Sequence, residues 1–380
     1  MNFEFTEEQI MIQQSARDYA QRELIKDVLE RDAKAEFPTH HVKALSDLGF
    51  MGMLVDPKYG GGGMDTVSYV LAMEEISKID SSVSVIMSVN NSLVCYGIEN
   101  FGTEEQKEKF LRPLANGTCI GAFLLSEPDA GSDATSQRTT AEDKGDHYLI
   151  NGVKNWITNG NSASTYLVIA QTHPEKGHKG INALIVDRHS PGITLGPHED
   201  KMGMRSSDTH SVMFNDVRVP NENRIGEDGF GFKFAMKTLE GGRIGIAAQA
   251  LGIAQGAYER AVQYSKQRKA FGTEIANHQS LAFKLAEMHT RIEAARYFCL
   301  KAAWLKDQNK PYGTASAIAK YWAAETAMYV TTEAVQIHGG YGYVREYHVE
   351  RLMREAKLTQ IYEGTSEIQK IIISRAILSE

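Results

Sequence analysis

The segment His147–Gly160, "HYLINGVKNWITNG", lies in a part of the chain where β-branched and aromatic runs alternate with turn signals. β-branched and aromatic residues flank Asn151-Gly152, a dipeptide that readily adopts the positive φ angles of a two-residue hairpin turn. We therefore predict a β-hairpin here. Three further runs have the composition of strands: "STYLVIAQT", "GINALIVD" and "SVMFNDVRVP", the last ending at Pro220. Together they predict a compact antiparallel β-domain between about residues 120 and 220.

Helix signals precede this β-rich region. Threonine followed three residues later by glutamine is the capping-box pattern of a helix start, and an aspartate can also cap a helix, whereas Asn-Gly can end one. The signals are Thr6 with Gln9, Thr103 with Gln106, Asp65 before "TVSYVLAMEEISKI", and Asn116-Gly117 after Phe110 and Leu111.

Three long alanine-rich segments with helical periodicity follow the β-rich region, namely Phe232–Gln267, Ser280–Lys306 and Thr314–His338. Short polar links separate them, as in an antiparallel bundle. Gly241-Gly242 inside the first segment is costly for helix stability, so it predicts a break or a close approach by a ligand.

The chain of 380 residues is longer than a usual single domain. The succession of patterns predicts an α+β multidomain fold. We expect an N-terminal α-helical domain over 1–119, a middle antiparallel β-domain over 120–225 and a C-terminal four-helix-bundle-like α-domain over 226–380.

Composition argues against several classes of protein. The net charge of −7, without a lysine- or arginine-rich run, argues against a nucleic-acid partner. No run of about 18 apolar residues is present, and the acidic start "MNFEFTEEQI" resembles neither a signal nor a transit peptide. We expect a cytoplasmic protein, or one of the mitochondrial matrix if a presequence has been removed. The three widely spaced cysteines are expected to be reduced core residues: Cys95, Cys119 and Cys299.

Several common catalytic patterns are missing from the sequence. There is no GxxxxGK[ST] phosphate loop, no GxGxxG after a strand, no HExxH pair and no GxSxG elbow. His338 and His348 lack partners at metal-ligand spacing, so structural or interface roles are favoured and no metal site is expected.

The segment Thr359–Leu378, "TQIYEGTSEIQKIIISRAIL", places an acid in the turn before a helix. Ser366 and Gln369 have capping-box spacing, and Gly364 leaves the backbone beside Glu363 free to bend. By itself, this carboxylate has two interpretations. It either stabilises the helix N-terminus and does nothing more, or it does chemistry that the rest of the chain must identify.

Two other segments carry a resemblance: "LLSEPDAGSDATS" (Leu124–Ser136) and "QIHGGYGYVREYHVERLMREAK" (Gln336–Lys357). Alone, each could be a loop or a solvated helix face. In this order on a helix–β–helix layout, together with "QIYEGTSEIQ", they resemble the acyl-CoA dehydrogenase family over essentially the whole chain. The likeness is greatest to the short-chain, butyryl-CoA branch, through "GGRIGIAAQALGIAQGA" and "AVQIHGGYGY".

The resemblance implies an FAD-dependent enzyme without a Rossmann fold. The expected reaction is α,β-dehydrogenation of a short-chain acyl-CoA to trans-2-enoyl-CoA, in which Glu363 takes the α-proton and flavin N5 accepts the β-hydride. Burial would strengthen such a base by raising its pKa. An electron-transferring flavoprotein as electron acceptor and a homotetramer, a dimer of dimers, are also implied.

The resemblance further implies site residues by position. Trp156 would pack on the isoalloxazine, and Arg268 and Phe271 would hold the pyrophosphate and adenine side of a flavin that reaches a neighbouring subunit. Ala270 departs from the polar residue of many relatives. The FAD positions are Phe123, Leu125, Ser126, Ser132, Trp156, Thr158, Arg268, Phe271, His278, Gln279, Gln336, Gly340, Thr365 and Glu367. The substrate positions are Ser132, Glu240, Arg243, Tyr362 and Gly364.

Two branches of the family carry the base elsewhere, directly before the arginine that matches Arg243. Gly242 occupies that position here, so Glu363 is the expected base. Residues 87–93 and Tyr362 are expected to set the depth of the acyl pocket. The alternatives are a flavin oxidase or monooxygenase of the same fold and a non-catalytic acyl-CoA- or flavin-binding scaffold.

Overall fold

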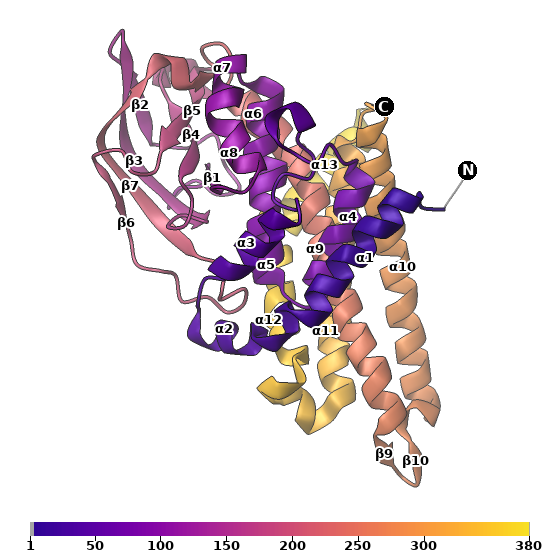
Figure 1. The fold of residues 1–380 in the computed structure, drawn as a ribbon. Helices are drawn as coiled ribbons and strands as arrows, with labels where there is room; N and C mark the ends of the chain where they lie inside the picture. The colour runs from indigo at the N-terminus through magenta and orange to yellow at the C-terminus, as the bar shows by residue number, and fades with distance from the viewer. Residues whose placement is uncertain (1–3, 380) are drawn as a thin grey trace.

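The structure, a computed structural model, describes residues 4–379. Helices, a β-sheet and a second set of helices follow one another along the chain, and Figure 1 shows the sheet to one side of the long C-terminal helices. The helix–β–helix order expected from sequence is therefore confirmed. The domain boundaries expected near residues 119 and 225 stay predictions.

The N-terminal part is helical, and its start and stop signals act as expected. Thr6 and Thr103 each form a reciprocal capping box, Asp65 accepts from the Ser68 N–H, and Gly117 has φ 71° just after a helix end. The elements are α1 (Glu7–Arg22), η1 (Leu24–Lys26), α2 (Val28–Lys34), α3 (Thr39–Asp47), η2 (Pro57–Tyr59), α4 (Thr66–Ser77), α5 (Ser81–Ser88), the π-helical η3 (Val89–Cys95), α6 (Tyr96–Phe101), α7 (Glu104–Gln106), the π-helical η4 (Lys107–Leu111) and α8 (Arg112–Ala115).

The middle part is a sheet with strand order β6-β7-β3-β2-β4-β5-β8. Most pairs are antiparallel, as expected, but β1 and β2 each pair with β4 in parallel, so the sheet is mixed. Its elements are β1 (Gly121–Leu124), β2 (Thr140–Asp143), β3 (His147–Thr158), β4 (Thr165–Gln171), η5 (Pro174–Gly180), β5 (Ile181–Asp187), β6 (Ile193–Leu195), β7 (Thr209–Pro220), η6 (Asn221–Asn223) and β8 (Arg224–Ile225).

The predicted hairpin at Asn151-Gly152 is wrong. Both residues lie inside β3, which runs from His147 to Thr158 and pairs along its length with β7. The pairing register shifts between Ile150 and Gly152, and Gly152 has φ 142°. The dipeptide therefore marks a β-bulge, a feature that shares its preference for glycine with a tight turn.

The C-terminal part is a bundle in which α9, α10 and α11 pack together and α12 and α13 pack against α11. The three long helices begin and end within one residue of the expected segments. The elements are α9 (Gly231–Gln267), β9 (Lys269–Ala270), β10 (Thr273–Glu274), η7 (Ile275–Asn277), α10 (Gln279–Asp307), α11 (Gly313–His338), η8 (Gly339–Tyr343), η9 (Arg345–Tyr347), α12 (Val349–Thr359) and α13 (Ser366–Leu378).

Two local expectations in this part need correction. The break at Gly241-Gly242 does not occur, because α9 continues through both residues. The last helix is capped one residue earlier than expected: the Thr365 hydroxyl accepts from the Ile368 N–H, while Ser366 is the first helical residue. Ser366 instead donates to Glu325 of α11 at 2.7 Å.

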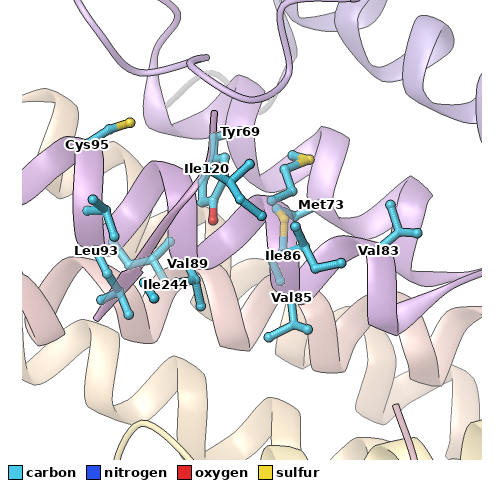
Figure 2. Close-up of a cluster of buried hydrophobic side chains, with 14 of the residues drawn as sticks. Tyr69, Met73, Val83, Val85, Ile86, Val89, Leu93, Cys95, Ile120 and Ile244 are labelled. Atoms are coloured by element: carbon cyan, nitrogen blue, oxygen red, sulfur yellow. The ribbon is translucent and has the colours of Figure 1, made fainter. Parts of the chain in front are cut away.

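The core joins the N-terminal helices to α9. Figure 2 shows Leu93 and Val89 of η3 beside Ile244 of α9, with Tyr69 and Met73 of α4 nearby, and all five side chains are buried. The first residue of β1 is tied to the same segment, since the Gly121 N–H donates to the Asn90 side chain of η3 at 2.9 Å. The η3 segment therefore connects the sheet to the C-terminal bundle.

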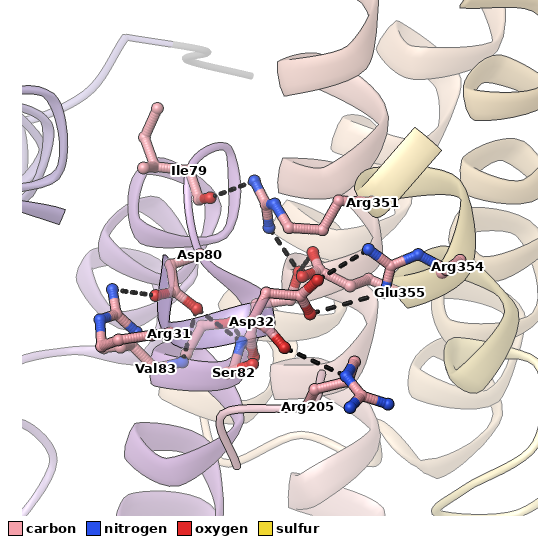
Figure 3. A network of polar contacts seen from close by, with 12 residues as sticks. Arg31, Asp32, Ile79, Asp80, Ser82, Val83, Arg205, Arg351, Arg354 and Glu355 are labelled. Carbon is pink, nitrogen blue, oxygen red and sulfur yellow. Dashed lines mark hydrogen bonds and ion pairs between the residues drawn. The ribbon is translucent and has the colours of Figure 1, made fainter. Parts of the chain in front are cut away.

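A buried polar network makes a second connection between the parts of the chain (Figure 3). Arg351 of α12 pairs with Glu355 and donates to the Ile79 carbonyl, both at 2.7 Å. Arg354, on the same helix, pairs with Asp32 of α2 at 2.7 Å. These contacts fix α12 against the N-terminal helices.

Two properties of the described residues bear on the expected location and redox state. None of the described helices combines the length and the apolar character that a membrane crossing requires. Cys95 and Cys299 are buried free thiols, and Cys119 is a half-buried one.

Candidate active site

The turn between α12 and α13 holds Glu363 in an unusual backbone conformation. Glu363 has φ 51° and Gly364 has φ 91°, so two successive residues are left-handed. That conformation is unfavourable for a residue with a side chain and persists only where the surroundings impose it. Two donors meet at the Gly364 carbonyl: Lys320 Nζ of α11 at 2.7 Å and Gln369 Nε2 of α13 at 2.8 Å.

The Glu363 carboxylate faces α9 at its glycine pair. A Cβ atom added at Gly242 would lie 2.4 Å from Glu363 Oε2 and 2.7 Å from Leu93 Cδ2. The close approach expected at this glycine pair is therefore made by the chain's own carboxylate. Glu363 Oε2 is inaccessible to solvent and has no hydrogen-bond partner among the described residues.

Burial raises the pKa of Glu363 to about 7, against the opposing influence of Lys320 first and Arg243 second. Neither cation forms a direct ion pair with it within the described chain, although both are buried. Burial also lowers the pKa of Lys320 to about 8 and holds that of Arg243 below its usual range. The Glu363 carboxylate is thus influenced by two buried cations and forms a direct ion pair with neither.

The backbone N–H of Glu363 is a further group of this turn without an acceptor. Tyr362 and Ser366 donate their N–H groups to the Leu358 and Gln360 carbonyls at the end of α12, whereas the N–H groups of Glu363, Gly364 and Thr365 have no backbone acceptor within residues 4–379. An unpaired donor of this kind is available to a ligand oxygen.

The residue before Glu363 anchors the turn to α9 and α5. The Tyr362 hydroxyl donates to the Gln249 side-chain oxygen, and Gln249 Nε2 donates to the Ser81 carbonyl at 2.9 Å and the Ser84 hydroxyl at 2.8 Å. Burial holds the pKa of Tyr362 well above its usual value. The tyrosine is therefore a neutral, fixed wall beside the carboxylate.

The other predicted substrate positions are divided between two places. Glu240 and Arg243 lie on α9 beside Gly242, and Glu240 lies against the start of α11, where a Cβ added at Gly313 would be 3.2 Å from its Oε1. Ser132 lies instead in an exposed part of the loop between β1 and β2.

Five of the predicted flavin positions come together where β1 leaves the sheet beside β3. The Asn155 N–H donates to the Ser126 carbonyl at 2.8 Å, and Lys154 Nζ donates to the Leu125 carbonyl at 3.0 Å. This first group consists of Phe123, Leu125, Ser126, Trp156 and Thr158. Trp156 has φ 61° and is 60% exposed, so its indole offers a flat apolar face.

A second group lies at the far end of α9, around the β9–β10 hairpin. Arg268, Gln336 and Gly340 line a pocket of about 590 Å³. Phe271, at the tip of the hairpin, is 97% exposed, and its ring lies 5.9 Å from that of His278. The group consists of Arg268, Phe271, His278, Gln279, Gln336 and Gly340.

One chain does not bring these two groups together. Phe123 of the first group lies against Phe234 near the start of α9, with ring centroids 6.4 Å apart. Phe234 and Arg268 are about 50 Å apart along the helix, at 1.5 Å per residue. Figure 1 shows the hairpin at the end of the molecule away from the sheet. Thr365 and Glu367 lie with Glu363 at the start of α13.

Two buried lysines in this region are not among the site residues predicted from the sequence. Lys154 holds the loop after β1 through Leu125 and pairs with Glu127 at 2.8 Å, and Lys320 holds the turn at Gly364. Each lysine lies at a sequence position where the periodicity of the apolar residues predicts a buried side chain. That periodicity is the signal from which its burial could have been predicted.

His338 and His348 are the two histidines for which structural or interface roles were predicted. His338 is the last residue of α11. His338 is buried and stacks on Tyr264 with ring centroids 4.3 Å apart. Among residues 4–379, the group with metal-ligand spacing is Asp27, His40 and His41. Asp27 there pairs with Arg31 at 3.0 Å.

Comparison with known proteins matches all three parts of the chain. The models described as acyl-CoA dehydrogenase N-terminal, middle and C-terminal domains match residues 6–118, 122–217 and 229–378. The chain belongs to the acyl-CoA dehydrogenase family.

The short-chain specific acyl-CoA dehydrogenase of Clostridium acetobutylicum is 49% identical over 99% of this chain and 100% of its own length. The structure of butyryl-CoA dehydrogenase from Megasphaera elsdenii matches with a TM-score of 0.98 and 50% identity, covering both chains completely.

Two further structures are similar. One, described as electron transferring flavoprotein of Acidaminococcus fermentans, matches with a TM-score of 0.99 and 50% identity over 100% of both chains. The other is a glutaryl-CoA dehydrogenase from Mycobacterium smegmatis in complex with FADH2, with a TM-score of 0.94 and 30% identity over 99% of this chain and 96% of that one.

Proposed function

We propose that this chain is an FAD-dependent dehydrogenase that converts a short-chain acyl-CoA thioester to its trans-2-enoyl-CoA, with Glu363 as the catalytic base. The observation that carries the proposal is the buried Glu363 carboxylate, whose Oε2 has no partner among the described residues. The short-chain relatives, at 49–50% identity over the whole chain, support the substrate class.

The chemistry required of the base fits its surroundings. The α-carbon of a thioester must lose a proton, and a desolvated carboxylate with a pKa near 7 accepts one more readily than a solvated carboxylate. Arg243 and Lys320 limit the rise in the pKa of the carboxyl group, because each opposes the effect of burial. Gly242 leaves the space in which the carboxylate lies.

Negative charge develops on the thioester oxygen as the α-proton leaves. The free N–H of Glu363 is a donor for that oxygen, and the fixed left-handed turn holds it in place before the substrate arrives. Tyr362 is held next to the base by its hydrogen bond to Gln249, and Leu93 packs at the same glycine as the carboxylate, so both limit the access of water.

The residues present fit FAD in two respects. Trp156 presents an exposed indole face where β1 and β3 meet, and Arg268 places a guanidinium at a pocket of about 590 Å³, a group suited to a diphosphate. Phe123, Leu125, Ser126, Ser132 and Thr158 would complete the ring side of the site. When bound, FAD supplies the acceptor for the hydride that leaves the β-carbon.

The distance between the two groups has a consequence for assembly. Because Phe234 and Arg268 are about 50 Å apart along α9, the hairpin residues of one chain serve a flavin held by another copy. The exposed Phe271 then becomes an interface residue. We propose a homo-oligomer, the expected form being a tetramer, with an electron-transferring flavoprotein as the electron acceptor.

The test is anaerobic titration of the purified protein with butyryl-CoA, followed by flavin absorbance. Bleaching of a yellow protein is the expected result, and longer and branched acyl-CoAs then rank the substrates. A yellow protein that no acyl-CoA bleaches would overturn the dehydrogenase assignment. A colourless protein that cannot be reconstituted with FAD would overturn the cofactor assignment as well.

A further inference from the structure

Lys320 is a buried ammonium without a carboxylate partner in direct contact. Its side chain is 0% exposed, and it forms no ion pair with the described acidic residues. One hydrogen bond holds it, from Nζ to the Gly364 carbonyl at 2.7 Å. Burial of a charge with so little compensation is costly, so a helix selected for packing alone would place an apolar residue here.

The position of this hydrogen bond links Lys320 to the base. Gly364 follows Glu363 directly, and its carbonyl receives donors from two different helices, Lys320 of α11 and Gln369 of α13. The two donors cross-link the turn whose left-handed residues direct the carboxylate at Gly242. Removing either donor frees that turn to adopt a commoner conformation.

Charge gives Lys320 a second influence on Glu363. The groups that face Glu363 are Lys320 from α11, Arg243 from α9, and the uncharged hydroxyls of Tyr69 and Tyr362. Lys320 is the largest of the influences that oppose burial there. In turn, the charged groups that face Lys320 are Glu363, Arg243, Glu325 of its own helix and Glu367 of α13.

We propose that Lys320 is a positioning residue for the base, acting through the Gly364 carbonyl and through its positive charge next to Glu363. This inference rests on the proposed function, because it takes Glu363 as the base. Lys320 need not touch substrate or flavin for this role.

Two variants separate the positioning role of Lys320 from its contribution to the stability of the fold. Lys320→Gln keeps a hydrogen-bond donor but removes the charge, and Lys320→Met removes both. Lys78→Met is the matched control, because Lys78 is also a buried lysine but pairs with Glu75 and Glu259, away from the turn. Flavin content and thermal midpoint are recorded for each, so that a variant that fails to fold is identified.

The first measurement is the rate of anaerobic flavin reduction by butyryl-CoA as a function of pH. We expect the acid limb of the profile to move up by on the order of one pH unit in Lys320→Gln. The rate at the plateau should fall roughly tenfold further in Lys320→Met, because the turn is then released. Lys78→Met should keep the wild-type profile. A wild-type acid limb in Lys320→Gln would overturn the proposal.

The second measurement does not require turnover. Infrared titration of the protonated carboxyl band, assigned to Glu363 by its loss in Glu363→Gln, reports the ionisation of the base directly. The midpoint should rise in both Lys320 variants, and an unchanged midpoint would contradict the proposal. If butyryl-CoA fails to bleach the wild type, the proposed function fails, while the infrared titration still decides whether Lys320 controls Glu363.

Discussion

Glu355 and Glu363 lie close together in the sequence and both have buried carboxyl oxygens, yet their surroundings are opposite. Glu355 accepts from Arg351 at 2.7 Å (Figure 3) and also from the Ser81 hydroxyl. Glu363 has two cations nearby but no partner for its Oε2. Burial raises the pKa of both carboxyl groups. Direct partners, rather than burial, therefore separate a structural carboxylate from one that is available for chemistry.

The largest expected effect concerns the structural carboxylate, Glu355. Arg351→Met leaves Glu355 as a buried carboxylate without its cation, which should cost about 3–5 kcal/mol of unfolding free energy. Urea unfolding checks this. The proton affinity of Glu355 rises further in the variant, and a raised pKa in the folded state makes stability fall as pH rises, so the deficit should shrink at lower pH.

Arg354→Met is the matched control for that experiment. Arg354 belongs to the same network but is partly exposed, so its loss should cost less. Flavin reduction per folded molecule should be unchanged in Arg351→Met. Wild-type stability of Arg351→Met would show that the Glu355 pair does not hold α12 in place.

The next largest effect concerns the reactive carboxylate, Glu363. Glu363→Gln should lower turnover by at least about 10²-fold while the flavin stays bound, because an amide cannot accept the α-proton. Steady-state turnover with butyryl-CoA is the measurement. The folded-state pKa of Glu363 is above its ordinary value, so ionisation costs stability as pH rises to about 7. Glu363→Gln should therefore be at least as stable as the wild type at pH 8, and near-normal turnover in a yellow variant would exclude Glu363 as the base.

A smaller effect tests the space around the base. In Gly242→Ala the new Cβ would lie 2.4 Å from Glu363 Oε2, so the carboxylate must move. We expect turnover to fall by about 10- to 100-fold, the scale on which misplaced catalytic groups act. Gly241→Ala is the control, since its Cβ would meet nothing closer than Lys306 Nζ at 3.6 Å. Equal activity of the two variants would contradict the steric argument.

The smallest expected effect tests the pKa of the base. A base with a pKa of about 7 is mostly protonated at pH 6 and mostly ionised at pH 8. The rate of flavin reduction should therefore rise about tenfold between these values in the wild type. A rate that does not change over this interval would mean that the titrating base is another group.

The sequence predicted the helical parts well because their signals are local. The Thr6 and Thr103 capping boxes and the ends of α9, α10 and α11 depend on residues within a few positions. The hairpin at Asn151-Gly152 failed because β3 continues through this dipeptide and pairs with β2 before it in the chain and with β7 far along the chain. A bulge and a turn require the same dipeptide, and the local sequence does not distinguish them.

The candidate site was predicted only in part, because it too depends on contacts between residues far apart in the sequence. The position of Glu363 in a turn before a helix follows from "YEGTSEIQ", but the partners of that turn come from other helices. Gly242 was identified as an approach point, although the approaching group proved to be Glu363. Lys320 was missed because a lysine in an alanine-rich helix is usually solvated, and its partner, the Gly364 carbonyl, lies 44 residues further along the chain.

The steric relation between positions 242 and 363 also constrains how such a chain can evolve. The two positions share one small volume, so a carboxylate at either excludes one at the other. If the base moved to position 242 by single substitutions, the intermediate protein would have either carboxylates at both positions, crowded against each other, or a carboxylate at neither. The two positions should therefore be strongly epistatic, and relocation of the base requires paired change.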